Sequence, residues 1–217
     1  AVLADAAPEP DFTRIFNGKT LAYWTPIGGD SSNWVAQDGR IVTGGKDHGW
    51  LRHAFPYNDF TLRLDYRLSP GANSGIFFRV PRDADPVASG LEIQLNDDDT
   101  PASQGLQPAL RTGSVYKILA ADQGAAHPAG SWNSLELTVR GDRVLVWING
   151  TTVLDGVPRP SPGVPRTDRF LGLQSWQGQV EFRDIRIKDL KPDAPPAKVP
   201  SPLLKKSVRP RTKAKGR

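Results

Sequence analysis

The chain contains no cysteine, no methionine and only three histidines, and each of these scarcities excludes a type of site. Without cysteine it can form neither a disulfide framework nor a thiolate-bound zinc site. The small number of histidines, only His48, His53 and His127, argues against a histidine-rich metal site. No stretch reaches the roughly 18 apolar residues of a membrane-spanning helix. Chemistry must therefore come mainly from carboxylates, amides, guanidinium groups and aromatic rings.

Acidic and basic residues are unevenly distributed along the chain. The formal net charge is +5, but residues 191–217 alone hold nine Lys or Arg against one acid, Asp193, which leaves the rest of the chain at −3. The basic balance therefore gives no reason to expect specific nucleic-acid binding by the folded part. Residues 191–217 are rich in Pro and then in Lys and Arg, which predicts a disordered tail. This tail either contacts an anionic polymer or a membrane surface through its charge, or serves only solubility.

The first residues indicate a short arm. Residues 1–11 are small and contain two prolines, with no apolar periodicity, so we expect them to be flexible. They resemble the end of an export signal followed by a mature arm, although a position at which the chain was cut fits equally well. On the first interpretation, the protein is exported to the periplasm or cell envelope of a bacterium.

Residues 12–190 show the pattern of a single all-β domain. In the stretch from Thr61 to Leu68 apolar and polar residues alternate strictly, as in a half-buried antiparallel strand. Turn pairs such as Asp38-Gly39 and Asn149-Gly150 predict tight hairpins. About 12 strand candidates, among them a short one over residues 112–118, and no amphipathic helix predict a jelly-roll β-sandwich of two antiparallel sheets. We expect a monomer or a small oligomer.

The residues of greatest functional interest lie between positions 71 and 99. Two apolar strands there flank a polar loop; the first presents Arg79, and the second presents Glu92 and Gln94 on one face. A carboxylate, an amide and a guanidinium on one sheet face would suit a polyol or a carbonyl sugar. The simpler alternatives are a salt bridge between Arg79 and Glu92, or an ordinary solvated face.

An acidic run follows directly. Asp97, Asp98 and Asp99 could bind Ca²⁺ through hard oxygen ligands, although a solvated acidic loop is the simpler interpretation. No other cofactor or metal is predicted. Residues 97–111 form a long irregular segment, which in a compact domain is usually functional or mobile.

Six motifs in order resemble the 3-keto-disaccharide hydrolase domain, formerly domain of unknown function 1080. They are NSGIFFR, LEIQLND, TGSVYKI, GSWN, VRGDRVLVWINGTTVLD and GLQSWQGQVEFRDIRIKDL. The resemblance extends over roughly residues 12–190. It implies a concanavalin A-like jelly roll and an exported bacterial protein that acts on carbohydrate.

The resemblance also implies a reaction. A ketone at C3 of a glycoside acidifies the C2 hydrogen, so a base can remove it, the C1 substituent leaves, and water then adds. Such a site needs one base and one group that stabilises the enolate oxygen. Glu92 or a histidine would be the base, and Arg79 would stabilise the enolate. The residues expected to bind substrate are Gln94, Tyr116, Asn73 and Gln174.

The sequence departs from the family pattern at one place. Family members commonly carry a histidine shortly after Gly-Leu-Gln of the last sheet, whereas here the chain reads Gln174-Ser175-Trp176. Activity is therefore either retained in altered form or lost. Trp176 becomes a candidate platform for stacking against a sugar ring. Three hypotheses remain: an enzyme acting on 3-keto-glycosides, a non-catalytic carbohydrate-binding module, and an interaction domain that binds through the basic tail.

Overall fold

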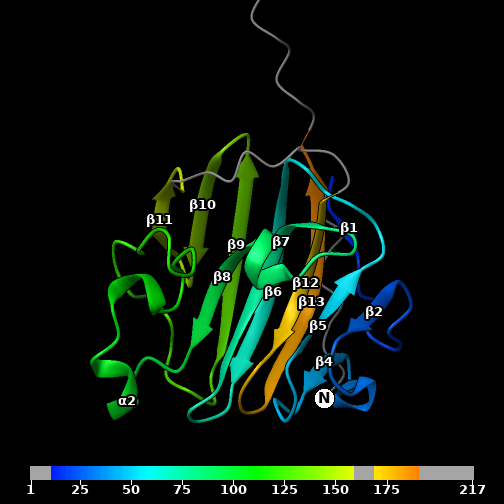
Figure 1. Cartoon of the computed structure of the whole chain (residues 1–217), viewed down its shortest axis with the longest axis horizontal. Coiled ribbons are helices and arrows are strands. Elements are labelled where there is room, and N and C mark those ends of the chain that lie inside the picture. Colours follow the sequence, from blue (N-terminus) through cyan, green and yellow to red (C-terminus); the bar gives the residue numbers. More distant parts are fainter. Residues whose placement is uncertain (1–10, 159–168, 191–217) are drawn as a thin grey trace, which may run out of the picture.

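Two antiparallel β-sheets packed face to face form the described part of the molecule. The computed structural model describes residues 11–158 and 169–190, and Figure 1 shows the two sheets stacked one behind the other. The predicted basic tail, and all but one residue of the predicted N-terminal arm, lie outside these ranges. The predicted all-β sandwich of two antiparallel sheets is confirmed.

The larger sheet has eight strands in the order β11-β10-β9-β6-β13-β4-β3, with β1 paired to β13 at one side. Its strands are β1 (Thr13–Arg14), β3 (Trp34–Gln37), β4 (Arg40–Thr43), β6 (Phe60–Leu68), β9 (Trp132–Arg140), β10 (Arg143–Ile148), β11 (Thr151–Gly156) and β13 (Val180–Asp189). Two of the predicted hairpin turns lie where expected, at Asp38-Gly39 between β3 and β4 and at Asn149-Gly150 between β10 and β11, and all four residues have positive φ.

The smaller sheet has five strands in the order β2-β5-β12-β7-β8. They are β2 (Trp24–Ile27), β5 (Gly49–His53), β12 (Arg169–Ser175), β7 (Asn73–Pro81) and β8 (Leu91–Asn96). The sequence predicted one more strand over residues 112–118, and this is wrong: Val115 forms only isolated bridges, to Ile93 and Leu119. Positive φ at Gly113 and Lys117 turns the backbone on either side of Val115, so the segment lies against β8 without continuing as a strand.

The main core lies between the sheets. The alternation in β6 is confirmed, because Leu62, Leu64 and Tyr66 all belong to this core. A second, smaller cluster (Trp50, Phe77, Val80 and Phe170) packs separately from the main core. Since neighbouring residues on β7, such as Ile76 and Phe78, belong to the main core, this second cluster covers the outer face of the smaller sheet.

Helical structure is limited to short turns in loops. These are α1 (Pro86–Ser89), α2 (Pro101–Gln104) and two 3-10 turns, Ser31–Asn33 and Pro108–Leu110. The 3-10 turn at Pro108–Leu110 and helix α2 both lie in the segment 97–111. This segment is therefore locally ordered. Within the described residues, no helix has the length and apolar character needed to cross a membrane.

Candidate functional site

The outer face of the smaller sheet gathers most of the predicted site residues. In the register of β7 with β8, Phe77 lies opposite Glu92 and Gly75 lies opposite Gln94. Ile76 and Ile93, one position away on each strand, point into the main core. Glu92 and Gln94 therefore share the outer face, as the sequence predicted.

Two glycines at the centre of this face make room for the side chains of neighbouring strands. A Cβ atom on Gly75 would lie 2.1 Å from Oε1 of Glu92, and one on Gly172 would lie 2.5 Å from Cε3 of Trp50. Only glycine leaves room for these two side chains, which lean inward over neighbouring strands. The side chains of Glu92 and Trp50 thus lie directly over Gly75 and Gly172. We call these two glycines the glycine floor.

Glu92 is a buried carboxyl group that no cation or hydrogen-bond donor neutralises. Its residue is 6% exposed, and within the described part of the chain no hydrogen bond or ion pair reaches its carboxylate. Burial raises its pKa to about 8, and the charge of Lys117 opposes this rise. At neutral pH the group is mostly protonated, and its ionised fraction is a stronger base than an exposed glutamate. Strongly perturbed carboxyl groups of this kind are typical of functional sites.

Two amides on either side of the glycine floor have unused acceptors. Nε2 of Gln94 donates to the carbonyl of Leu110 at 3.4 Å. The Oε1 atoms of Gln94 and Gln174 are both buried and have no hydrogen-bond partner in the described structure. Since a buried amide oxygen without a donor is costly, both positions favour a ligand that supplies hydroxyl groups after a small rotation of the side chain.

Tyr116 lies beside Glu92 on the edge segment. Its backbone N–H donates to the carbonyl of Glu92 at 2.9 Å. The ammonium group of Lys117 lies 4.9 Å from the centre of the Tyr116 ring. The charge of Lys117 lowers the pKa of Glu92. Strand periodicity could not indicate this, because Lys117 lies outside the paired strands.

Arg79 does not join this site, contrary to expectation. Val80 pairs with Phe170 and Phe77 with Gly172, so two residues, Phe78 and Arg79, oppose the single Leu171 in a β-bulge. Arg79 has φ of 58°, and Val80 rather than Arg79 takes the outward position. The strict alternation assumed from the sequence is broken here.

The side chain of Arg79 instead reaches the turn between β9 and β10. It donates to the carbonyl of Gly141 and lies 3.7 Å from the carboxylates of both Asp59 and Asp142. These partners give the guanidinium a structural role that ties the end of β7 to the hairpin. Neither the predicted salt bridge to Glu92 nor a position over the glycine floor is observed.

Asn73 and the acidic run stabilise one end of the sheet. Nδ2 of Asn73 donates to Oδ1 of Asn96 at 3.3 Å. Asp97 accepts from the backbone of Gly71 at 2.8 Å, and Asp98 accepts from that of Thr112 at 3.0 Å. Asn73 shares the outward face of β7 with Gly75, and its amide group is held by Asn96 at this end of the sheet.

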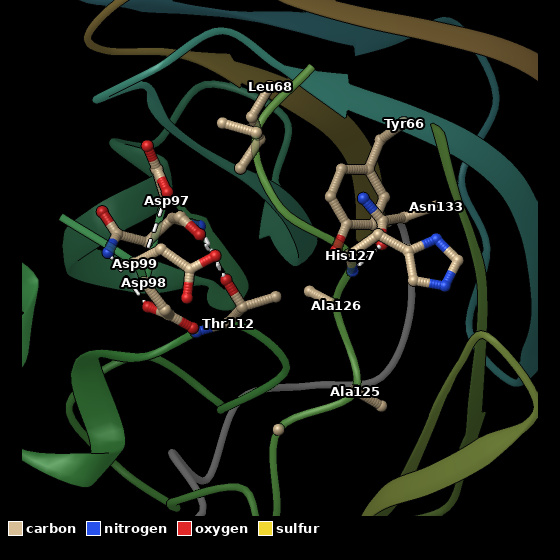
Figure 2. A pocket seen from close by; sticks show the side chains of 13 residues that line it. Tyr66, Leu68, Asp97, Asp98, Asp99, Thr112, Ala125, Ala126, His127 and Asn133 are labelled. Carbon is tan, nitrogen blue, oxygen red and sulfur yellow. Dashed lines mark hydrogen bonds between the residues drawn. The ribbon is translucent and has the colours of Figure 1, made fainter. Parts of the chain in front are cut away.

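Figure 2 shows Asp97, Asp98 and Asp99 on one side of a small cavity, with Tyr66 and His127 on the other. The cavity has a volume of about 140 Å³. Among the described residues, no group of three or more acidic or histidine side chains is arranged to hold a metal ion. The carboxylates of Asp97 and Asp98 accept hydrogen bonds from backbone N–H groups of neighbouring loops.

A larger pocket adjoins the glycine floor on the side of β5. Its volume is about 630 Å³, and Trp50, Phe77 and Gln174 line it together with Trp176 and His48. The rings of Trp176 and His48 are stacked, with centroids 3.8 Å apart and planes inclined by 14°. Trp176 is 44% exposed, so one face of this stack is available to a ligand.

Sequence reasoning did not single out Trp50 or His48 as site residues. Trp50 was not recognised as a site residue because an apolar residue in a strand most often belongs to the core. Its pairing with Gln174 shows that it lies on the outward face of the smaller sheet. The other two histidines are elsewhere: His53 is buried among aromatic rings, where burial lowers its pKa to about 4, and His127 lies in the loop of Figure 2.

Comparison with known proteins agrees with this architecture. Residues 11–188 match the model of the 3-keto-alpha-glucoside-1,2-lyase-like domain. A 3-keto-disaccharide hydrolase of Bacteroides thetaiotaomicron is 26% identical, over 82% of this chain and 78% of that protein.

Solved structures give the same result for the fold. A candidate glycosyl hydrolase from Parabacteroides distasonis superposes with a TM-score of 0.71 at 26% identity, covering 83% of this chain and 94% of that one. The carbohydrate-binding module CBM66 from Bacillus subtilis has a TM-score of 0.55 at 14% identity, covering 77% and 96%, and shares only the fold. The family model covers most of the chain, and the chain therefore belongs to the family of 3-keto-alpha-glucoside-1,2-lyase-like domains.

Proposed function

We propose that this protein cleaves 3-keto-glycosides, such as oxidised disaccharides, by elimination followed by hydration, with Glu92 as the base. The observation that carries the proposal is a buried carboxyl group without a partner, placed beside a glycine floor on the outer sheet face. Family membership and the names of its relatives support a carbohydrate substrate.

The reaction requires one proton transfer before the glycosidic bond breaks. The ionised carboxylate of Glu92 takes the proton from C2, and the electron pair of that C–H bond forms an enolate with the C3 ketone. As the enolate collapses, the bond from C1 to the glycosidic oxygen breaks, leaving a C1=C2 double bond, and the departing oxygen takes a proton. Water then adds, with hydroxide to C1 and a proton to C2, so that the net reaction is hydrolysis. A pKa of about 8 makes Glu92 a stronger base for this step than an ordinary glutamate.

The neighbouring groups suit the remaining tasks. Since Arg79 is engaged elsewhere, we assign stabilisation of the enolate oxygen to the hydroxyl of Tyr116 and the ammonium of Lys117, the donors on the same edge as Glu92. Gln94 and Gln174 would accept hydrogen bonds from sugar hydroxyls through the amide oxygens that now lack partners.

The direct test is turnover by purified protein. We expect release of 3-keto-glucose from a 3-keto-glycoside, with no cleavage of the corresponding unoxidised glycoside, because only the ketone acidifies the C2 hydrogen. Loss of turnover in Glu92→Gln, with unchanged circular dichroism, would support the assignment of the base. Absence of turnover across a panel of oxidised glycosides would refute the proposal.

A second candidate function is carbohydrate binding without catalysis. It is favoured by one observation: Trp176, an exposed aromatic residue, stands where the family resemblance implies a histidine. On this alternative the protein would bind unoxidised and oxidised glycans alike and release no product. The structure also brings His48 against Trp176 from another segment, so an imidazole is still present at this end of the site.

A further inference from the structure

We infer that the pocket beside β5 is a binding site for a neutral, unoxidised pyranose such as glucose, recognised by polar atoms on β5 and β12 and by the ring of Trp176. This site goes beyond the proposed reaction, because it requires neither a ketone on the sugar nor the carboxyl group of Glu92. It lets the protein bind ordinary sugar units of a glycan as well as an oxidised one.

Three residues that line the pocket carry a buried polar atom without a hydrogen-bond partner among the described residues. These atoms are Nε1 of Trp50, Nε of Arg52 and Oε1 of Gln174. Trp50 is paired with Gln174 across β5 and β12, and Arg52 follows Trp50 by two positions, so the three side chains share the outward face of the smaller sheet. Because unpaired buried groups cost stability, the pocket favours an occupant that supplies their partners.

The chemistry of the three atoms suits hydroxyl groups. Nε1 of Trp50 and Nε of Arg52 are donors, whereas Oε1 of Gln174 is an acceptor. A hydroxyl group both donates and accepts, so neighbouring hydroxyls on one sugar ring satisfy both kinds of atom. Small rotations of the flexible Arg52 and Gln174 side chains bring their atoms to the ligand.

The charges that line the pocket favour a neutral occupant. Two guanidinium groups, of Arg52 and Arg82, and two carboxylates, of Asp83 and Asp85, line it. Both guanidinium groups lie over the ring of Phe170, at 5.1 and 4.6 Å from its centre. Since opposite charges are equal in number, the pocket attracts neither an anion nor a cation strongly.

The pocket also offers a flat surface for a sugar ring. Its volume of about 630 Å³ lies within the range of roughly 300–1,000 Å³ that is usual for ligand sites. The ring of Trp176 is stacked on His48, and the residue is 44% exposed, so one face of the stack is available to a ligand. The hydroxyl groups of glucose are equatorial, so its C–H groups form apolar ring faces that can pack on the indole.

Titration of the purified protein with methyl β-D-glucopyranoside, followed by NMR, tests the site directly. This glycoside has no ketone, so the proposed reaction does not consume it. We expect saturable binding with a Kd on the order of 1 mM, and weaker binding of inorganic phosphate. Absence of saturation by about 20 mM would leave the unpartnered atoms to water and overturn the site. Tighter binding of phosphate than of the glycoside would also overturn it.

Two variants identify the surface that is responsible. We expect Kd to rise about tenfold in Trp176→Ala, which loses the stacking surface, and about three- to tenfold in Trp50→Phe, which loses the N–H group. Trp147→Ala is the matched control, because Trp147 is a similarly exposed tryptophan (38%) on the larger sheet, and it should leave Kd unchanged.

The exposed position of Trp176 keeps this test independent of folding. Trp50 is buried, so thermal unfolding of Trp50→Phe is measured first, whereas Trp176→Ala removes a side chain from the surface. An unchanged Kd in Trp176→Ala, or an equal rise in Trp147→Ala, would overturn the site.

Glu92→Gln separates this site from the proposed reaction. Because Glu92 does not line the pocket, we expect Kd for methyl β-D-glucopyranoside to stay within about twofold of the wild-type value. A rise in Kd as large as that in Trp176→Ala would mean that the glycoside lies beside Glu92, and it would overturn the separate site. Absence of turnover of 3-keto-glycosides would refute the proposed function and leave this binding prediction intact.

Discussion

Glu92 and Glu181 are two buried glutamates on the outward faces of the two sheets, and they differ in what surrounds them. Glu181, 7% exposed on β13, accepts from Arg67 at 2.8 Å and from Arg40 at 2.9 Å. Glu92, 6% exposed on β8, has neither an ion pair nor a hydrogen bond to its carboxylate within the described residues. A glutamate of similar burial is thus paired with arginines in the larger sheet and left unpaired in the smaller one.

The contrast extends to the sheet faces around them. On the larger sheet, ion pairs join neighbouring strands, as in Arg63–Glu136 at 2.6 Å and Arg183–Asp65 at 3.1 Å. On the smaller sheet, the amide oxygens of Gln94 and Gln174 lack partners. Burying a polar group without a partner costs stability, so the smaller sheet is the face on which a ligand would recover that cost.

The largest effect that distinguishes the two glutamates is expected on kcat, in the variant Glu92→Gln. Glu92→Gln keeps the shape of the side chain and removes the base, so we expect kcat to fall by about 10²- to 10⁴-fold. Glu181→Gln is the matched control and should leave kcat of the folded protein within about threefold, since it lies on the other sheet. Comparable losses in the two variants would mean that burial, and not position, decides the effect.

The stability of the protein should depend on pH through Glu92. Its folded pKa of about 8 lies above the ordinary value of 4.5, so the folded state holds the proton more tightly. The corresponding stability is complete below about pH 4.5, is lost as pH rises towards 8, and changes no further above that. In urea unfolding at several pH values, wild type should lose a few kcal/mol relative to Glu92→Gln across this window. A constant difference would contradict the buried, unpaired state of Glu92.

Glu181→Gln should lower the stability of the protein, whereas Glu92→Gln should lower kcat. Removing the carboxylate charge leaves Arg40 and Arg67 without their shared partner. We expect the free energy of unfolding at pH 7 to fall by about 1–3 kcal/mol, measured by urea denaturation. An unchanged midpoint would show that these ion pairs contribute nothing measurable.

Arg79→Gln distinguishes the observed position of this residue from the one that the sequence suggested. Because the guanidinium contacts Gly141, Asp59 and Asp142, we expect a loss of about 1–2 kcal/mol in stability and less than a threefold change in kcat. A fall of a hundredfold or more in kcat, with normal stability, would restore Arg79 to the chemistry.

The smallest expected change in a pH profile is at Lys117, and it comes in addition to the fall in kcat that loss of its ammonium group from the enolate oxygen should cause. Its charge lowers the pKa of Glu92, so Lys117→Gln should raise that pKa and shift the pH dependence of kcat/KM upward by less than about one unit. A downward shift would exclude Lys117 as the cation that acts on Glu92.

The fold and half of the site could be predicted because they depend on simple periodicity. Alternation in the strand that contains Glu92 and Gln94 correctly placed both on one face, and turn pairs marked the hairpins. The sequence prediction put Arg79 on the wrong face because a β-bulge interrupts the alternation of β7 at this residue. The local sequence contains no signal for a positive φ at an arginine.

Other features depend on distant partners and could not be predicted. Trp50 and Gln174 become neighbours only through pairing of β5 with β12, which are more than 100 residues apart in the chain. The same holds for the stack of His48 on Trp176. The need for glycine at positions 75 and 172 becomes visible only in the structure, where the side chains of Glu92 and Trp50 lie over them.

The central claim is that Glu92 is an unpaired base with a raised pKa, and the pH profile of kcat/KM for a 3-keto-glycoside tests it most directly. The account predicts that kcat/KM rises with pH, bends near pH 8 and then levels off, since the ionised form of the free enzyme is the active one. In Glu92→Gln the residual activity should lose this bend. A profile in wild type that is already level by about pH 6, or a bend near pH 8 that survives in Glu92→Gln, would contradict the account.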